Sequence, residues 1–100
     1  MELLPEEIRK ALPSLYSTES ESDPVAQVKF FTPDSNWTWY AIEFDGDDLF
    51  FGLAVGFEAE LGYFRLSEPK AIRGPLGLPV EYDLYFTPLP LSKLLCKENA

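Results

Sequence analysis

The most constraining feature of the sequence is a pair of alternating apolar runs joined by a short polar turn. The runs are 37-WTWYAIEF-44 and 49-LFFGLAVGF-57, and the residues between them, 45-DGDD-48, favour a tight reversal of the chain. Successive side chains of a strand point to opposite faces, so the runs predict an antiparallel hairpin with large apolar side chains on both faces. One face is expected to be core, and the other needs a separate explanation.

The side chains at facing positions predict the register of this hairpin. If Phe44 lies opposite Leu49, every position on each face has a suitable partner. The apolar face then pairs Ile42 with Phe51, Tyr40 with Leu53 and Thr38 with Val55, and the second face pairs Glu43 with Phe50, Ala41 with Gly52, Trp39 with Ala54 and Trp37 with Gly56. A slip of one residue would break both patterns.

A second reversal at 58-EAEL-61 predicts a third strand, 62-GYFRL-66, that returns along the hairpin. The predicted pairs are Phe64–Val55 and Leu66–Leu53 on the core face, and Tyr63–Gly56 and Arg65–Ala54 on the second face. Phe57 belongs to the core face in this register. The three strands together predict an antiparallel meander.

The remaining segments complete the expected fold. Two further strands are predicted at 25-VAQVKFFT-32 and 80-VEYDLYF-86, with helices after Pro5, after a Ser67 cap over 68–73, and after Thr87 and Pro88. In the first helix the four-residue spacing of Leu4, Ile8 and Leu12 predicts one apolar stripe that packs on the rest of the fold. The fold class is therefore α+β, an antiparallel sheet meander of about four to five strands with short N-terminal, middle and C-terminal helices. Residues 1–100 are expected to form a single domain, with a flexible acidic loop at 17–23 and a flexible tail at 97–100.

The charge balance limits the classes of partner. Seventeen acidic and eight scattered basic residues give a net charge of −9, which argues against direct nucleic acid binding and against anionic membranes. An acidic field favours a basic protein partner, and it also serves solubility alone. With no His and a single Cys, Cys96, we expect no internal disulfide, His-based triad, His/Cys zinc site or cofactor. The residues MELLPEEIRK have neither the basic region nor the apolar run of a leader, and no segment approaches a run of about 20 apolar residues, so we expect a cytoplasmic protein.

The second face of the meander is the predicted partner-binding site. It places Trp37, Trp39 and Tyr63 beside small residues, with Arg65 reaching over Trp39 in a cation–π contact and Glu43 at the rim. Leaving two Trp side chains bare would forfeit several kcal/mol of burial at about 1.5–3 kcal/mol each. Either the helices of the chain cover this face, or a protein partner or a second copy does so.

Carboxylates supply the alternative, enzymatic hypothesis. A convergent pair in a pocket, at least one member with a raised pKa, would suit a small hydrolase or a divalent-metal-dependent enzyme. The candidates are Glu43, Glu58, Glu60, Glu81 and Asp83. The run 45-DGDD-48 lacks the spacing of an EF-hand loop and is interpreted as a hairpin turn.

Several blocks of the sequence resemble a family of bacterial proteins, domain of unknown function 2958. The blocks span most of the chain: 13-PSLYSTE-19, 28-VKFFTPDSNWTWYAIEFD-45, 50-FFG-52, 58-EAELGYF-64, 74-GPLGL-78 and 81-EYDLYF-86. Tyr82 stands where the family pattern has Arg, so no role for a basic residue there is carried over. The resemblance implies a short cytoplasmic protein of the kind often encoded on plasmids and other mobile elements, and it implies no mechanism.

These observations favour a non-enzymatic protein-interaction module with an aromatic face on an acidic surface. A special form of this hypothesis is a DNA mimic that occupies a nuclease or repressor. It would require carboxylates arrayed on one face.

Overall fold

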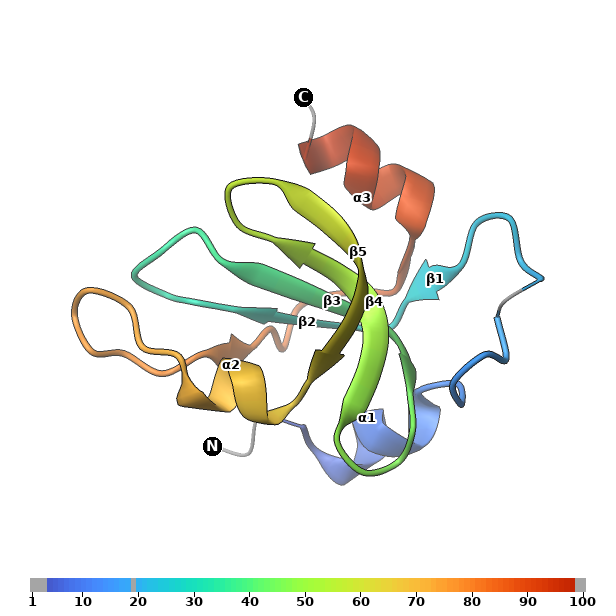
Figure 1. Ribbon diagram of the computed structural model, residues 1–100, viewed down its shortest axis with the longest axis horizontal. Helices are drawn as coiled ribbons and strands as arrows, with labels where there is room; N and C mark the ends of the chain where they lie inside the picture. Colours follow the sequence, from blue (N-terminus) through green and yellow to red (C-terminus); the bar gives the residue numbers. More distant parts are fainter. Residues whose placement is uncertain (1–3, 19, 99–100) are drawn as a thin grey trace.

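Three short helices and seven strands make up the part of the chain that the structure describes, residues 4–18 and 20–98 of a computed structural model (Figure 1). In chain order they are α1 (Glu6–Ala11), β1 (Val25–Ala26), β2 (Val28–Phe31), β3 (Thr38–Phe44), β4 (Leu49–Val55), β5 (Ala59–Arg65), α2 (Ser67–Ala71), β6 (Glu81–Tyr82), β7 (Leu89–Pro90) and α3 (Leu91–Glu98). Residue 19 of the predicted acidic loop and residues 99–100 of the predicted tail lie outside the described residues.

The strands form two antiparallel sheets. The larger has the order β5-β4-β3-β2-β6, and β1 pairs with β7 in a separate ribbon of two short strands. Strands β3, β4 and β5 are neighbours both in sequence and in space, which is the predicted meander. The α+β class is therefore confirmed.

The predicted hairpin register is confirmed at its open end. The turn 45-DGDD-48 closes the hairpin, and the carboxylate of Asp45 accepts hydrogen bonds from the backbone N–H groups of Asp47, Asp48 and Leu49. The observed partners at the open end are Thr38–Val55, Trp39–Ala54, Tyr40–Leu53 and Ala41–Gly52.

A bulge changes the register between Ala41 and Glu43, and the predicted pairing is wrong beyond it. Glu43 lies opposite Phe51, and Phe44 lies opposite Phe50. Because the bulge inserts one residue, the side chains that follow it exchange faces. Phe44 joins the face of Trp39, and Glu43 leaves that face.

The register of β5 also differs from the prediction, by five residues. The second reversal occupies only 56-GFE-58, so Val55 already pairs with Ala59. An offset of five residues moves every side chain of β5 to the other face of the sheet, since the strand period is two. Phe64 consequently lies opposite Phe50, and Tyr63 stands on the face away from Trp39.

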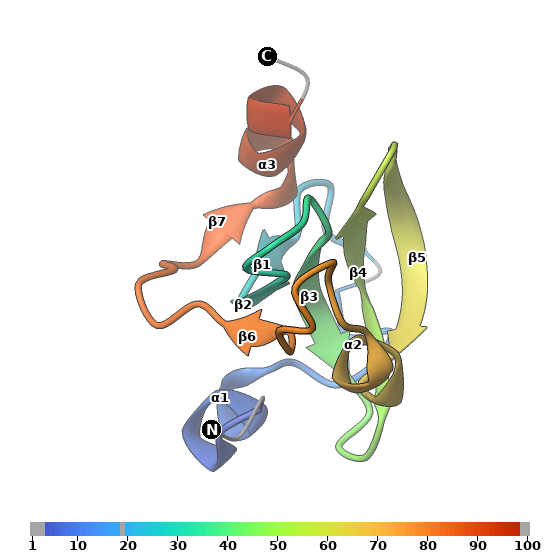
Figure 2. The ribbon, with the colours of Figure 1, turned by 90° about the vertical axis from the view of Figure 1, so that its left-hand side faces the viewer.

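Other elements of the chain cover both faces of the large sheet around β3, whereas β5 is mostly exposed. On the first face, α1 and the ends of α2 cover a cluster that contains Leu4, Leu12, Val28, Phe30, Trp39, Phe44, Phe50, Phe64 and Leu66. On the second face, α3 and the β1–β7 ribbon cover Ala26, Tyr40, Ile42, Leu53 and Leu94. Figure 2 shows α1 and α3 at opposite ends of the view with the sheet between them. The hairpin is apolar on both faces because each face has its own cover.

Two predicted strands are shorter in the structure. The run 25–32 divides at Gln27, whose N–H donates to the carbonyl of Ala41, and its halves belong to different sheets. The run 80–86 pairs only over Glu81–Tyr82. Beyond it the chain turns, because the side chain of Asp83 accepts a hydrogen bond from the N–H of Tyr85.

The helices are confirmed with shifted starts. Helix α1 follows Pro5, and Leu4 and Leu12 are buried as the spacing predicts. Ser67 is the first residue of α2 rather than its cap, and its N–H and hydroxyl bond the carboxylate of Asp48. Helix α3 starts at Leu91, because 89–90 pair with β1.

Two glycines that face each other across β4 and β5 give a test of this packing. A Cβ on Gly52 would overlap the backbone carbonyl of Tyr40, whereas a Cβ on Gly62 would meet nothing within 4 Å. We expect Gly52→Ala to lower the free energy of unfolding by about 1–3 kcal/mol, as for other overpacked sites, in urea denaturation. Gly62→Ala is the matched control and is expected to be neutral or slightly stabilising. Equal effects of the two substitutions would contradict the observed register.

Candidate functional site

Glu43 is a buried carboxylate whose position depends on the bulge in β3. Its side chain points away from the Trp39 face and is only 3% exposed. It meets residues 16–18, which lie between α1 and β1. Oε1 accepts a hydrogen bond from the N–H of Tyr16 at 2.8 Å, and Oε2 accepts one from the N–H of Thr18 at 2.9 Å and one from its hydroxyl.

The backbone at Tyr16 is adapted to this arrangement. Its φ of 67° lies in the left-handed region, which a residue with a side chain adopts at an energetic cost. The carboxylate stabilises this local conformation because it collects the N–H groups of Tyr16 and Thr18 on one acceptor group.

Two opposing effects determine the protonation of Glu43. Burial raises the pKa of this carboxyl, but the hydrogen bonds from the Thr18 hydroxyl, the Thr18 N–H and the Tyr16 N–H together outweigh burial and lower the pKa below its ordinary value. Glu43 is thus a permanent negative charge at neutral pH.

The segment 13–24 is fastened at its other end by Asp23. The Asp23 carboxylate accepts hydrogen bonds from the N–H of Ser92 at 2.8 Å and from the Ser92 hydroxyl at 2.6 Å, and the N–H of Leu91 donates to the carbonyl of Pro24. The bonds from Ser92 lower the pKa of Asp23. Both ends of the predicted acidic loop 17–23 are therefore held, and its flexibility stays a prediction.

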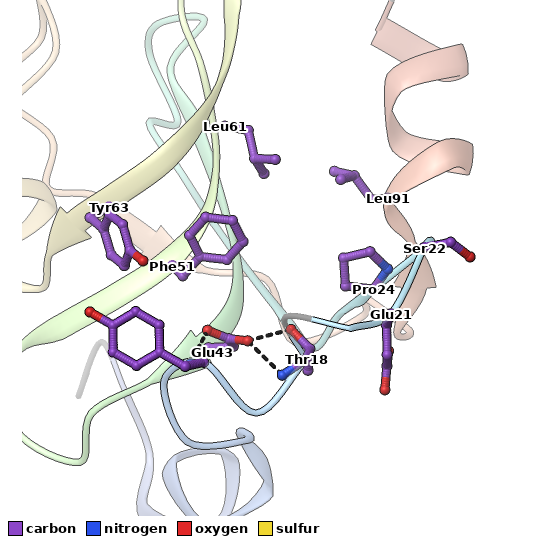
Figure 3. Close-up of a pocket in the computed structure, with 10 residues that line it drawn as sticks. Thr18, Glu21, Ser22, Pro24, Glu43, Phe51, Leu61, Tyr63 and Leu91 are labelled. Atoms are coloured by element: carbon purple, nitrogen blue, oxygen red, sulfur yellow. Dashed lines mark hydrogen bonds between the residues drawn. The ribbon is translucent and has the colours of Figure 1, made fainter.

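A cavity of about 350 Å³ lies between this segment and the second face of the sheet (Figure 3). We call it the Glu43 pocket. Its lining combines aromatic, aliphatic, hydroxyl and carboxylate side chains: Tyr16, Thr18, Glu21, Ser22, Pro24, Glu43, Phe51, Leu61, Tyr63 and Leu91. The Tyr63 ring lies 6.4 Å from the ring of Tyr16 and 5.2 Å from that of Phe51, centroid to centroid.

A second cavity, of about 210 Å³, lies near the β4–β5 turn and is lined by Trp37, Ala54, Phe57, Glu58 and Glu60. We call these five residues the Trp37 surface. The Trp37 ring stacks on Trp39 at 6.1 Å and meets the edge of Phe57 at 6.2 Å. Phe57 is 98% exposed, so its predicted place in the core is wrong. The turn leaves its side chain without a covering element in the described structure.

The five residues predicted to form one aromatic groove lie in three places. Trp37 and Trp39 are stacked, but Trp39 is 4% exposed and belongs to the core, while Trp37 is 39% exposed. Glu43 and Tyr63 line the pocket on the other face. Arg65 lies at the β3–β4 turn, with its guanidinium 3.6 Å from the carboxylate of Asp48, and not over Trp39. The bulge and the β5 offset are the causes.

Of the five carboxylates of the enzymatic hypothesis, Glu58 and Glu60 line the same cavity, whereas Glu43, Glu81 in β6 and Asp83 lie in other parts of the structure. Glu43 is in its pocket, Glu58 and Glu60 belong to the Trp37 surface, and Asp83 pairs with Lys29 at 3.8 Å near the β2–β6 edge. The pKa of the one buried member is lowered, whereas an acid catalyst needs a raised value. Among the side chains that the structure describes, no three potential ligands are grouped to hold a metal ion.

The model of the family described as "Protein of unknown function (DUF2958)" matches residues 3–98. The chain belongs to this family. The resemblance of the sequence blocks is thereby confirmed over nearly the whole chain. No curated protein and no solved structure matches the chain. None of the helices in the described part of this DUF2958 chain is long and apolar enough to cross a membrane.

Sequence reasoning missed the segment that completes the Glu43 pocket. Tyr16 and Thr18 lie in 13-PSLYSTE-19, one of the blocks typical of DUF2958, but no spacing in that block indicates a contact with β3. The only local signal is a single carboxylate, Glu43, inside an otherwise apolar strand. Such a charge needs partners when it is buried.

The lowered pKa of Glu43 gives a pH-dependent test. The ionised form stabilises the fold above the ordinary glutamate value of about 4.5, and this contribution is lost as the pH falls through the lower folded-state pKa. We expect Glu43→Gln to lower the free energy of unfolding at neutral pH by about 1–3 kcal/mol, because the amide NH₂ cannot accept the bonds. The difference should shrink as the pH falls below the ordinary glutamate value of about 4.5 and through the lower folded-state pKa, where the carboxyl of the folded chain becomes protonated.

Urea denaturation of both proteins across this pH range makes the measurement. Glu7→Gln, which changes an exposed glutamate of α1, is the control for loss of one charge. A difference that stays constant with pH would show that the ionisation of Glu43 does not matter to the fold.

Proposed function

We propose that this DUF2958 protein is a non-enzymatic binding module that holds a basic segment of a protein partner on the Trp37 surface. The observation that carries the proposal is the exposure of Phe57 beside the half-covered ring of Trp37. Burying a large apolar side chain contributes about 1.5–3 kcal/mol. A partner that covers the exposed aromatic pair at this turn would therefore be bound more tightly.

Charge complementarity indicates the chemistry of the partner. Glu58 and Glu60 flank the exposed ring, and the described lining of this cavity includes no basic side chain. The whole chain carries a net charge of −9, which speeds association with a positively charged surface and disfavours pairing with another copy of the chain. A segment with an apolar residue next to Lys or Arg fits both features.

The finer form of the proposal concerns the biological role. Proteins that bind nucleic acid carry concentrated positive charge, so a nuclease or a repressor is the basic partner that an acidic protein would occupy as a DNA mimic. The mobile-element setting that the family resemblance implies agrees with such a regulator. A cytoplasmic location belongs to the same proposal.

The proposal is tested by immobilising the chain, capturing a protein partner on it, and comparing the amount bound by the native chain and by its variants. We expect a basic protein to bind the native chain and to bind Phe57→Ala at least about 30-fold more weakly, the loss of about 2 kcal/mol that marks a central aromatic anchor. Tyr85→Ala removes an aromatic side chain that is 92% exposed elsewhere and is expected to bind normally. Glu58→Gln with Glu60→Gln should weaken binding more than Glu6→Gln with Glu7→Gln.

Several results would count against this function. Equal retention of the captured protein by Phe57→Ala and Tyr85→Ala would remove the Trp37 surface from the interface. Dimerisation that Phe57→Ala abolishes would assign the surface to a second copy instead. For the DNA-mimic form, duplex DNA must compete with the chain for the purified partner, and failure to compete would reject that form alone.

A further inference from the structure

We propose that the Glu43 pocket is a binding site for an organic cation, the guanidinium or ammonium group of a basic side chain. The pocket lies on the face of the sheet away from Trp37 and Phe57, because Phe51 and Tyr63 alternate with the residues of the Trp37 surface along β4 and β5. The inference therefore does not rest on the proposed function.

The first argument is the missing countercharge of a buried carboxylate. Among the described residues the ion pairs join Lys10 to Glu6, Lys29 to Asp83 and Arg65 to Asp48, and none of them includes Glu43. The partners of Glu43 are neutral N–H and O–H groups, which satisfy its oxygens without cancelling its charge. Buried charges are usually paired, so the negative potential at the pocket wall favours a cation.

The second argument is the aromatic lining. The rings of Tyr16, Phe51 and Tyr63 all line the cavity. The centroid of the Tyr63 ring lies 6.4 Å from that of Tyr16 and 5.2 Å from that of Phe51. Aromatic rings around a cavity attract a cation through their quadrupoles, most strongly where water is excluded. Figure 3 shows Phe51 and Tyr63 on the sheet side of the pocket, beside the Glu43 carboxylate.

The third argument is shape and charge at the entrance. The volume of about 350 Å³ is at the small end of ligand sites and suits one side chain rather than a large cofactor. Leu61 and Leu91 offer apolar walls to the methylene stem of Arg or Lys, and the exposed carboxylate of Glu21 adds negative charge. None of the described lining residues is basic.

The direct experiment is an NMR titration of the full chain with N-acetyl-arginine amide, N-acetyl-lysine amide and N-acetyl-citrulline amide. Citrulline has nearly the shape of arginine without its charge. We expect the two cations to shift the backbone amides of Tyr16, Thr18 and Leu61, and citrulline to bind at least about tenfold more weakly, as expected for a cation held by a carboxylate and aromatic rings.

Variants of the lining keep the test independent of the structural role of Glu43. Tyr63→Leu keeps an apolar side chain but removes a ring, and Tyr85→Leu is its control outside the pocket. Glu21→Gln removes a charge at the pocket, and Glu7→Gln removes the same charge from α1. The affinity for N-acetyl-arginine amide should fall at least about threefold in each pocket variant and stay constant in each control.

A basic tripeptide distinguishes the two sources of the cation. Tighter binding of an arginine-containing tripeptide than of N-acetyl-arginine amide, with the same amides shifted, would assign the site to a protein partner. Equal binding would assign it to a free small cation. Equal binding of citrulline and arginine, or shifts spread over the acidic surface instead of the pocket, would overturn the proposal, and neither result would bear on the Trp37 surface.

Discussion

The bulge in β3 determines which face of the sheet Glu43 and Phe44 occupy. The packing of the first core cluster and the Glu43 pocket both depend on it. Without the extra residue between Ala41 and Glu43, Phe44 would face the second cluster and Glu43 would face the first. The bulge instead adds Phe44 to a stack with Phe50 and Phe64, at 4.5 and 5.1 Å, and directs the carboxylate to the segment 13–24. Bulges commonly redirect a side chain in this way beside functional sites.

The bulge also connects the two core clusters, through the segment 13–24. The N–H of Phe44 donates to the carbonyl of Pro13 at 2.9 Å, at the point where the chain leaves α1. Glu43 then holds the next residues, and Asp23 holds the start of α3. One segment thus runs from the helix on one face of the sheet to the helix on the other, and carboxylates fix it at both ends. That path forms one side of the Glu43 pocket.

The sequence alone predicted the parts of the fold that depend on local pattern. Strict alternation and the paired small residues predicted the open end of the hairpin, and the spacing of Leu4 and Leu12 predicted that both residues beside α1 are buried. The β5 register could not be predicted in the same way, because Gly56 and the residues after it permit a reversal at more than one position. The bulge has no local signature, since its stability comes from N–H groups more than twenty residues away in the chain. The five predicted site residues are therefore not gathered in one groove, although four of them lie at a cavity or a ring stack.

Strand β5 is the edge strand of the large sheet, and its exposure bears on how copies of the chain associate. It is seven residues long and mostly exposed, and no strand of the described residues pairs with its outer side. Glu60 and the overall charge keep copies of the chain apart at neutral pH. Near the isoelectric point of about 4.3 the net repulsion is weakest, so we expect edge-to-edge pairing through β5 to be favoured there.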